Sequence, residues 1–148
     1  MEHITDQPLD MAQLLEETRN STCGALVVFE GTVRDHHQGQ RVARMHYTAY
    51  KPLAERVLIE LEAHVKRHFG VAECRIVHRV GDMGIGEGSV MIVVRAEHRD
   101  EAFTAAKYAI DTLKVQVPIW KNDIYPDGST AFQDGVSLSS CGEEQPGS

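Results

Sequence analysis

Five basic side chains lie at predicted boundaries between secondary-structure elements, and their types and spacing have the clearest potential for chemistry. They belong to Arg34, His98, Arg99, Lys114 and Lys121. The chain of 148 residues carries a formal net charge of −7. A local group of cations on such a chain is suited to an anionic ligand, because the rest of the surface repels anions.

His98 and Arg99 immediately precede a predicted helix. The first N–H groups of a helix have no partner within the helix and carry a partial positive charge, so this position can hold a phosphate or a carboxylate. The alternative is that Arg99 forms surface ion pairs with Asp100 or Glu101 and that His98 only ends a strand. From the residues alone, the alternative is favoured.

Lys114 adjoins the apolar position Leu113 and is followed by the segment VPIW. One interpretation is that its amine is partly removed from water, which lowers the pKa toward neutrality, and a second cation such as Lys121 acts in the same direction. A neutral amine can serve as a base or a nucleophile. The alternative, favoured by composition, is that both amines extend into water with their stems on the core.

A metal site is the next hypothesis, because Asp35, His36 and His37, with His46 on the following strand, have ligand side chains. Their spacing matches no metal-binding motif, so we expect solvated loop histidines and neither metal nor cofactor. The three cysteines form no CxxC pair, which argues against a disulfide framework and predicts a reducing, cytoplasmic environment. None resembles an activated thiolate, so any sulfur that this protein moves must arrive from elsewhere.

The elements that must position the basic residues begin with a predicted helix over residues 11–19. Residues 23–34 and 41–50 are rich in β-branched and apolar side chains and predict two strands, with a polar loop over 35–40 between them. We expect these two strands to form a long antiparallel pair.

A helix is predicted over residues 52–70, because apolar residues recur every four positions and a proline occupies its first turn. Its acidic residues are expected to form a solvated face: Glu55, Glu60 and Glu62. Residues 73–80 and 89–96 predict a hairpin joined by the wide turn GDMGIGEG. A second helix over 100–116 has Phe103, Ala106, Ile110 and Leu113 on its apolar side and ends before Pro118, after which 118–125 are extended.

This order of elements predicts an α+β fold, a two-layer domain with a mostly antiparallel sheet and two main helices. We expect residues 1–132 to form a single domain and 133–148, rich in Ser, Gly and Glu, to form a mobile tail. No apolar run approaches the roughly 20 residues that span a bilayer, and no signal peptide is evident. The negative charge also disfavours nucleic acid as a partner.

Four segments in register resemble the large, catalytic subunit of molybdopterin synthase. They are FEGTVRDHHQG at 29–39, IVHRVGDMGIGEGSV at 76–90, AEHRDEAF at 96–103 and LKVQVPIWK at 113–121. The resemblance spans about residues 24–128, most of the chain. The HR pair before a helix, with LK and WK after it, is its most diagnostic part.

The resemblance implies an α/β-hammerhead fold and a sulfurtransferase of molybdenum cofactor biosynthesis. The enzyme would be a homodimer within a heterotetramer, each copy holding a small ubiquitin-like sulfur-carrier subunit whose Gly-Gly tail ends in a thiocarboxylate. It would convert precursor Z, a cyclic pyranopterin monophosphate, into the dithiolene of molybdopterin. Lys114 and Lys121 match the family's catalytic lysines, and Arg34, His98 and Arg99 match its substrate-binding positions.

The chain departs from the family pattern at Thr48, where an acidic residue is usual, and at Asn122 and Asp123, where a basic residue and Glu are usual. These departures concern the surroundings of Lys121 and the groove for the partner's tail. Two alternatives remain: a non-catalytic binding module for a phosphorylated small molecule or a peptide tail, and a metal-dependent hydrolase that uses the histidine loop.

Overall fold

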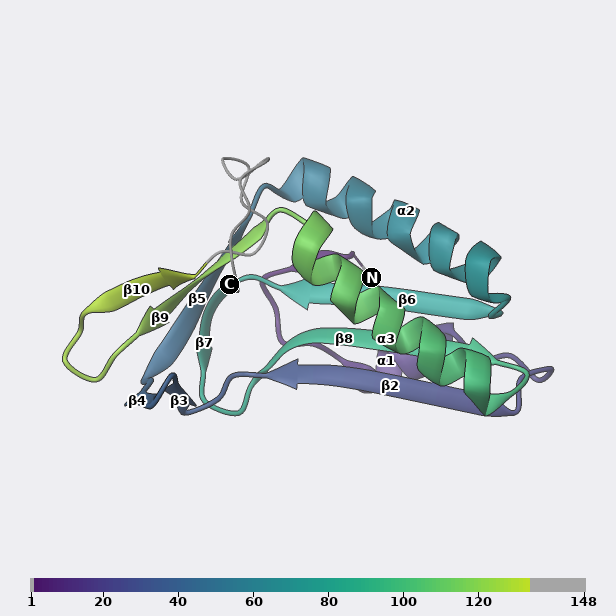
Figure 1. Cartoon of the computed structure of the whole chain (residues 1–148), viewed down its shortest axis with the longest axis horizontal. Coiled ribbons are helices and arrows are strands. Elements are labelled where there is room, and N and C mark those ends of the chain that lie inside the picture. The colour runs from purple at the N-terminus through teal and green to yellow at the C-terminus, as the bar shows by residue number, and fades with distance from the viewer. Residues whose placement is uncertain (1, 134–148) are drawn as a thin grey trace.

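The computed structural model describes residues 2–133, which fold into two four-stranded sheets, a small hairpin and three helices (Figure 1). The helices are α1 (Met11–Glu17), α2 (Lys51–Phe69) and α3 (Arg99–Gln116). The first sheet has the order β1-β6-β8-β2, the second has the order β10-β9-β5-β7, and β3 pairs with β4. The strands are β1 (Ile4–Thr5), β2 (Ala25–Thr32), β3 (His36–His37), β4 (Gln40–Arg41), β5 (Arg44–Ala49), β6 (Glu73–Arg79), β7 (Gly81–Gly84), β8 (Gly88–Ala96), β9 (Ile119–Ile124) and β10 (Thr130–Gln133).

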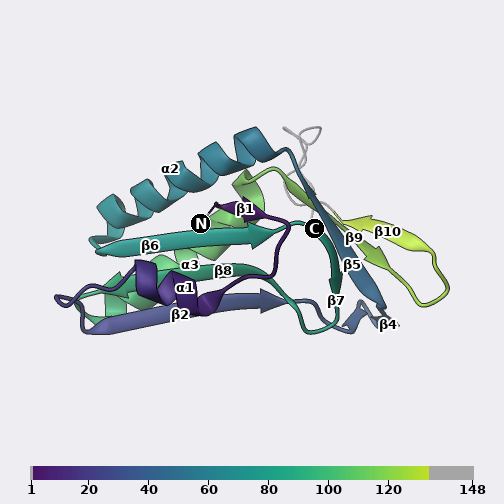
Figure 2. The same cartoon turned by 180° about the vertical axis from the view of Figure 1, so that it is seen from behind.

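The main core lies between the first sheet and the helices α2 and α3, and α1 covers the opposite face of that sheet (Figures 1 and 2). Leu58 of α2 packs there with Ile76 of β6 and Ile92 of β8, all fully buried. Helix α2 begins with proline in its first turn and ends at Gly70, whose φ of 67° suits glycine. This burial confirms the predicted apolar stripe and the predicted α+β class.

The predicted pairing of the first two long strands is wrong. Strand β2 pairs antiparallel with β8, and β5 lies in the second sheet between β7 and β9. Strand β8 is buried along almost its whole length, so it needs a neighbour on each side, and β2 and β6 supply them. The predicted loop over 35–40 contains the β3–β4 hairpin, whose turn at Gly39 has a φ of 82°.

The segment GDMGIGEG is more than a wide turn. Strands β6 and β8 do pair antiparallel, with His78 opposite Val90, as the hairpin prediction required. Between them, however, β7 leaves the first sheet and pairs with β5 of the second. Gly81, with a φ of 98°, marks the place where the chain passes from one sheet to the other. The two sheets therefore meet at this segment.

The predicted apolar face of α3 is correct except at Phe103, because Ala106 and Leu113 are buried and Ile110 packs against the core. Phe103 was expected inside but is 63% exposed, whereas Leu113 is buried as expected. The helix approaches the sheet and α2 through small side chains, which permit close packing and leave no room for a phenyl ring. These are Ala102, Ala105, Ala106 and Ala109.

The predicted solvated face of α2 is correct for Glu60 and wrong for its two acidic neighbours. The carboxylate of Glu62 accepts a hydrogen bond from the backbone N–H of Ile76 at 2.7 Å. The carboxylate of Glu55 accepts one from the backbone N–H of Ile4 at 2.8 Å. Both residues therefore attach α2 to the first sheet, because an extended N-terminal segment needs partners for its backbone donors.

The predicted tail, residues 133–148, lies outside the described residues except for Gln133, which ends β10. Within residues 2–133, no helix combines the length and the apolar character needed to cross a membrane.

Candidate active site

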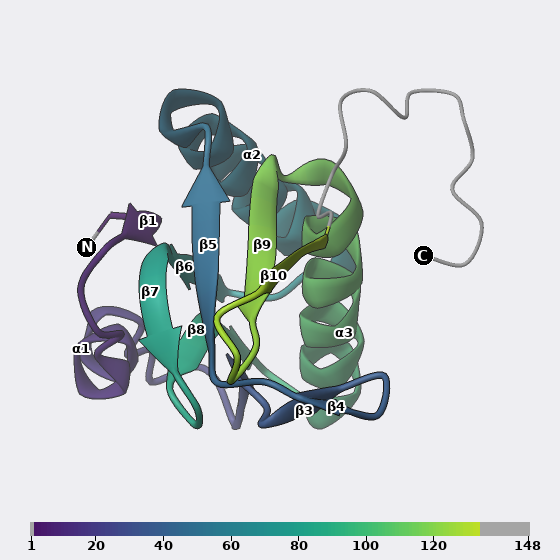
Figure 3. The same cartoon turned by 90° about the vertical axis from the view of Figure 1, so that its left-hand side faces the viewer.

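The end of α3 and the start of β9 bring the two predicted lysines into one region. Lys114 lies in the last turn of α3, and Lys121 lies on β9, which begins just after Pro118 ends the helix. Figure 3 shows β9 leaving the end of α3 and running beside β5. In this register Lys121 is the cross-strand partner of Tyr47.

Arg34 approaches the same region from the end of β2. The preceding residue, Val33, is buried, and its backbone N–H donates to the carbonyl of Glu87 at 3.0 Å. The carbonyl of Val33 in turn accepts from the N–H of Gly86 at 2.8 Å. These two bonds hold the exposed Arg34 next to the segment that joins β7 and β8.

Lys121 is the half-buried member of this cation group. Burial lowers the pKa of its amine below the ordinary value, because the charged form is poorly solvated there. The carboxylate of Asp123 acts in the opposite direction, whereas the positive charges of Lys114 and Arg34 lower the pKa further. The amine of Lys121 is thus neutral for a larger fraction of the time than an ordinary lysine.

For Lys114 the structure supports the interpretation that composition favoured, in which the amine extends into water. Lys114 is exposed, whereas its neighbour Leu113 is buried. The second sheet covers Lys121 instead. The expected repulsion between the two amines is present, since the charge of Lys114 contributes to the lowered pKa of Lys121.

A buried polar cluster lies beneath the lysines, and the sequence analysis missed it. Among residues 2–133, four polar or charged residues are buried, and three of them lie where the two sheets meet: His78, Ser89 and Asp123. The hydroxyl of Tyr47 hydrogen-bonds Ser89, and its ring is 5.0 Å from the ring of His78. The available signal was a polar residue at an inward position of an apolar strand, as His78 is in β6.

His98 and Arg99 lie at the opposite end of α3. The helix has 18 residues, so its ends are separated by about 27 Å at a rise of 1.5 Å per residue. His98 is 74% exposed, with Nδ1 3.7 Å from the carboxylate of Glu101 and 3.9 Å from that of Glu97. Within the described part of the chain, Arg99 forms no ion pair. A single chain therefore does not bring these two residues to Lys114 and Lys121.

The histidine loop does not converge on one point. His36 Nδ1 is 2.8 Å from the carboxylate of Asp35, and His46 Nδ1 is 2.9 Å from that of Asp82 on β7. No group of three or more His, Cys, Asp or Glu side chains that could hold a metal ion exists within residues 2–133. Cys74 is buried, and burial raises the pKa of its thiol to about 12.

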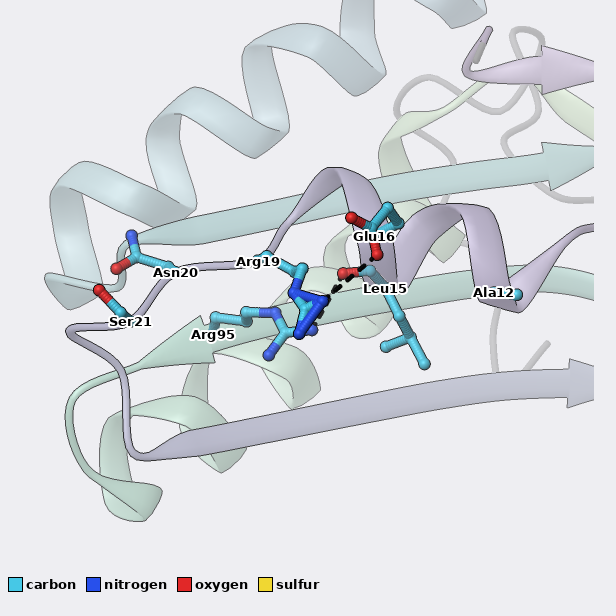
Figure 4. Close-up of a pocket in the computed structure, with 7 residues that line it drawn as sticks. All are labelled: Ala12, Leu15, Glu16, Arg19, Asn20, Ser21 and Arg95. Carbon is cyan, nitrogen blue, oxygen red and sulfur yellow. Dashed lines mark hydrogen bonds and ion pairs between the residues drawn. The ribbon is translucent and has the colours of Figure 1, made fainter.

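A groove lies elsewhere, between α1 and the first sheet (Figure 4). It has a volume of about 640 Å³ and is open to solvent. Its Arg95 is engaged structurally, with Nη2 donating to the carbonyl of Leu15 at 3.0 Å and Nε donating to Thr18 at 3.0 Å. Arg95 and Ser89 are six residues apart on β8, about 20 Å at 3.3 Å per residue. The groove is therefore distinct from the lysine site.

The fold and the lysine site define an α+β protein with a cationic site above a buried polar cluster. Comparison with known proteins gives the family. The model of the family described as MoaE protein matches residues 4–116. The chain belongs to this family. The matched residues include Arg34, His98, Arg99 and Lys114, while Lys121 lies just beyond them.

Individual relatives cover nearly the whole chain. The molybdopterin synthase catalytic subunit of Thermoplasma volcanium is 40% identical over 87% of this chain and 94% of its own length. That of Bacillus subtilis is 35% identical over 95% of this chain and 96% of its own length. These similarities confirm the resemblance found in the sequence.

Solved structures of related proteins have the same fold as this chain. The molybdopterin synthase of Staphylococcus aureus superposes with a TM-score of 0.84 at 36% identity, covering 89% of this chain and 96% of that one. A complex of subunits 1 and 2 of the molybdopterin-converting factor from Helicobacter pylori superposes with a TM-score of 0.75 at 26% identity, over 94% and 95% of the two chains.

Proposed function

We propose that this chain is the catalytic subunit of a molybdopterin synthase. It transfers sulfur from the thiocarboxylate at the C-terminus of a small sulfur-carrier protein to precursor Z, forming the dithiolene of molybdopterin. Family membership and the names of the relatives support the reaction. The observation that supports this reaction for this chain is that Lys121 is half-buried and feels the positive charges of Lys114 and Arg34.

Both reactants suit this site, because a thiocarboxylate and a cyclic phosphate are anions. The exposed cations of Arg34 and Lys114 attract and orient them. The lowered pKa of Lys121 makes its amine the better group for proton transfer or a transient covalent bond, since either role requires the neutral form. We therefore assign Lys121 the chemical step and Lys114 the stabilisation of developing negative charge.

His98 and Arg99 are assigned to substrate binding. Their distance from Lys121 along α3 means that they act at the same site only if a second copy of the chain supplies them. We therefore propose a homodimer with two equivalent sites, each built from the lysine end of one α3 and the His98–Arg99 end of the other. The exposed position of both residues leaves them accessible for such a contact.

The proposed partner of each copy is a small sulfur-carrier subunit, so that the assembly is a heterotetramer. The Helicobacter pylori structure, a complex of two subunits of the molybdopterin-converting factor, supports this assignment. The absence of a CxxC pair from the sequence supports a cytoplasmic location. We assign no metal and no cofactor to the reaction, whose sulfur comes from the partner.

The alternative of a non-catalytic binding module is tested by measuring product and binding together. Wild-type protein is mixed with precursor Z and the thiocarboxylated partner, and molybdopterin is quantified alongside partner affinity. We expect molybdopterin from the wild type and a large loss of rate with retained partner affinity for Lys114→Ala. A wild type that binds both components but forms no molybdopterin would establish the binding module. Loss of wild-type activity on chelation would favour a metal-dependent hydrolase.

A further inference from the structure

His78 lies in the buried cluster beneath the lysines, and its hydrogen bonding determines its chemical form. The residue is 4% exposed. Its Nδ1 is 2.7 Å from the carbonyl oxygen of Arg79, and because a carbonyl can only accept, Nδ1 carries the proton. Burial lowers the pKa of His78 to about 4, and the charges of Lys114 and Lys121 act in the same direction. The ring is therefore neutral at physiological pH.

A neutral imidazole with a protonated Nδ1 has a free lone pair on Nε2. No protein atom within residues 2–133 hydrogen-bonds this nitrogen, which is the ring atom farther from the β6 backbone. An apolar side chain of similar size would fill the same space without a polar atom to desolvate. The hydrogen bond to the Arg79 carbonyl accounts for Nδ1, whereas the packing within residues 2–133 gives no use to Nε2.

The neighbours of the ring connect it to Lys121. The ring of Tyr47 meets that of His78 edge-on, with centroids 5.0 Å apart and planes at 66°. Tyr47 is held in place because its hydroxyl bonds Ser89, which donates to the carbonyl of Gly31 at 3.2 Å. Tyr47 and Lys121 are cross-strand partners, so their side chains leave the second sheet on the same face.

We propose that His78 is a positioning residue for Lys121: its Nε2 accepts a hydrogen bond from a water molecule that is also bound to the amine of Lys121, and this bridge aims the amine at the bound anion. A neutral acceptor performs this task without the full charge of a carboxylate, which would hold the amine in its protonated form. This inference rests on the proposed function of the site. It adds a residue from β6, in the first sheet, to lysines on α3 and β9.

Two substitutions separate the two nitrogens of the ring. His78→Asn keeps a donor near the position of Nδ1 and removes the acceptor at Nε2. His78→Gln places an amide oxygen near the position of Nε2. Each variant is assembled into the full complex and assayed beside wild type with precursor Z and thiocarboxylated partner. We expect His78→Asn to lower kcat by about tenfold, with KM for precursor Z changed less than about twofold. We expect His78→Gln to retain kcat within about threefold.

A double-mutant cycle tests whether His78 acts through Lys121. Adding His78→Asn to Lys121→Ala is expected to cause no further loss of rate, because the amine that it positions is already absent. Equal rates for the Asn and Gln variants, or losses that multiply in the cycle, would overturn the proposal. An inactive wild type would instead count against the proposed function.

A measurement that needs no catalysis distinguishes failure of this proposal from failure of the proposed function. Nitrogen NMR of the imidazole in the folded complex is expected to show Nδ1 protonated and Nε2 unprotonated at neutral pH. The Nε2 signal is expected to move in Lys121→Ala, which removes the amine at the other end of the bridge, and to stay in place in Lys107→Ala, which removes an exposed lysine of α3. An Nε2 signal that is unchanged in Lys121→Ala would overturn the proposal even if every variant were folded.

Discussion

The two ends of α3 carry similar charges in opposite environments. At its start, His98 and Arg99 are exposed, and the nearest partners of His98 are the carboxylates of Glu97 and Glu101. At its end, Lys114 meets Lys121, which the second sheet half-buries above a cluster of buried polar groups. The start of the helix is suited to hold an anion. The end is suited to change the protonation state of an amine.

With the roles proposed above, burial rather than charge separates the reactive cation from the binding cations. Exposed cations are screened by water and keep their ordinary chemistry. Lys121 loses part of that screening because β5 and β9 place it beside Tyr47 and above His78. Each of the following variants tests this contrast, in order of decreasing expected effect.

The largest effect is expected for Lys121→Ala, which removes the buried amine. We expect kcat for molybdopterin formation to fall by roughly 10² or more, in the range usual for loss of a proton-transfer group. Lys107→Ala is the matched control, because Lys107 is exposed on α3 and pairs with Asp111 at 2.6 Å. Single-turnover assays with equal partner occupancy provide the rates. A loss below about threefold for Lys121→Ala would contradict the contrast.

Acid unfolding measures the free energy of unfolding that is lost because the buried cluster keeps His78 neutral. The pKa of His78 is about 4 in the folded protein and about 6.5 for an unperturbed histidine, so on acidification the unfolded chain takes up the proton first. This contribution to stability is fully present above pH 6.5 and is lost as the pH falls toward about 4, at most about 3 kcal/mol.

Urea titrations of wild type and His78→Gln between those pH values check this expectation. The variant should lose less stability over the window, since it has no group to protonate. His98→Gln is the control from the exposed end of α3, where the surroundings change little on unfolding. A wild-type stability that does not fall over the window would show that the cluster does not hold His78 neutral.

A smaller effect is expected for Arg99→Ala at the exposed end. If Arg99 holds the substrate anion equally well in the ground state and the transition state, its loss raises KM for precursor Z by about tenfold and changes kcat little. Steady-state kinetics with saturating partner give both constants. A fall in kcat with unchanged KM would place Arg99 in the chemical step and would erase the difference between the two ends.

The smallest effect is a gain of stability in Lys121→Met. Because the pKa of Lys121 is lowered in the folded protein, its charged form opposes folding at neutral pH, and this penalty fades only as the pH rises through the folded pKa toward the ordinary value. Methionine removes the charge and keeps the stem. We expect Tm at pH 7 to rise by roughly 2 °C, and Arg99→Met to give no such rise. A lower Tm for Lys121→Met would contradict the burial penalty.

The sequence predicted the elements better than their arrangement. Both long helices and the β6–β8 pair follow from local periodicity, and Pro118 and Gly70 mark helix ends. The partner of β2 could not be predicted, because strand pairing depends on which strand is buried on both faces, and that is a property of the assembled sheet. The prediction that Phe103 is buried was wrong for a similar reason. Alanine gives little periodic signal, yet alanines form the buried face of α3.

The sequence named candidate site residues, but it only partly predicted their surroundings. The resemblance identified Lys114 and Lys121, and the matched motif already contained His78. Which amine is desolvated depends on the second sheet, whose strands come from three separate parts of the chain. The signal from His78, a polar residue at an inward position of an apolar strand, does not reveal the free nitrogen that the hydrogen bond to Arg79 creates.

The central claim is that the lysine end of one chain and the His98–Arg99 end of another build one site, and a mixed dimer tests it most directly. One copy carries Lys121→Ala, the other carries His98→Ala with Arg99→Ala, and two different affinity tags isolate the mixed species. Each variant alone should be nearly inactive at a concentration of precursor Z well below KM. The account predicts about half of the wild-type rate, because one of two symmetric sites is intact. A mixed dimer as inactive as its parents would contradict it.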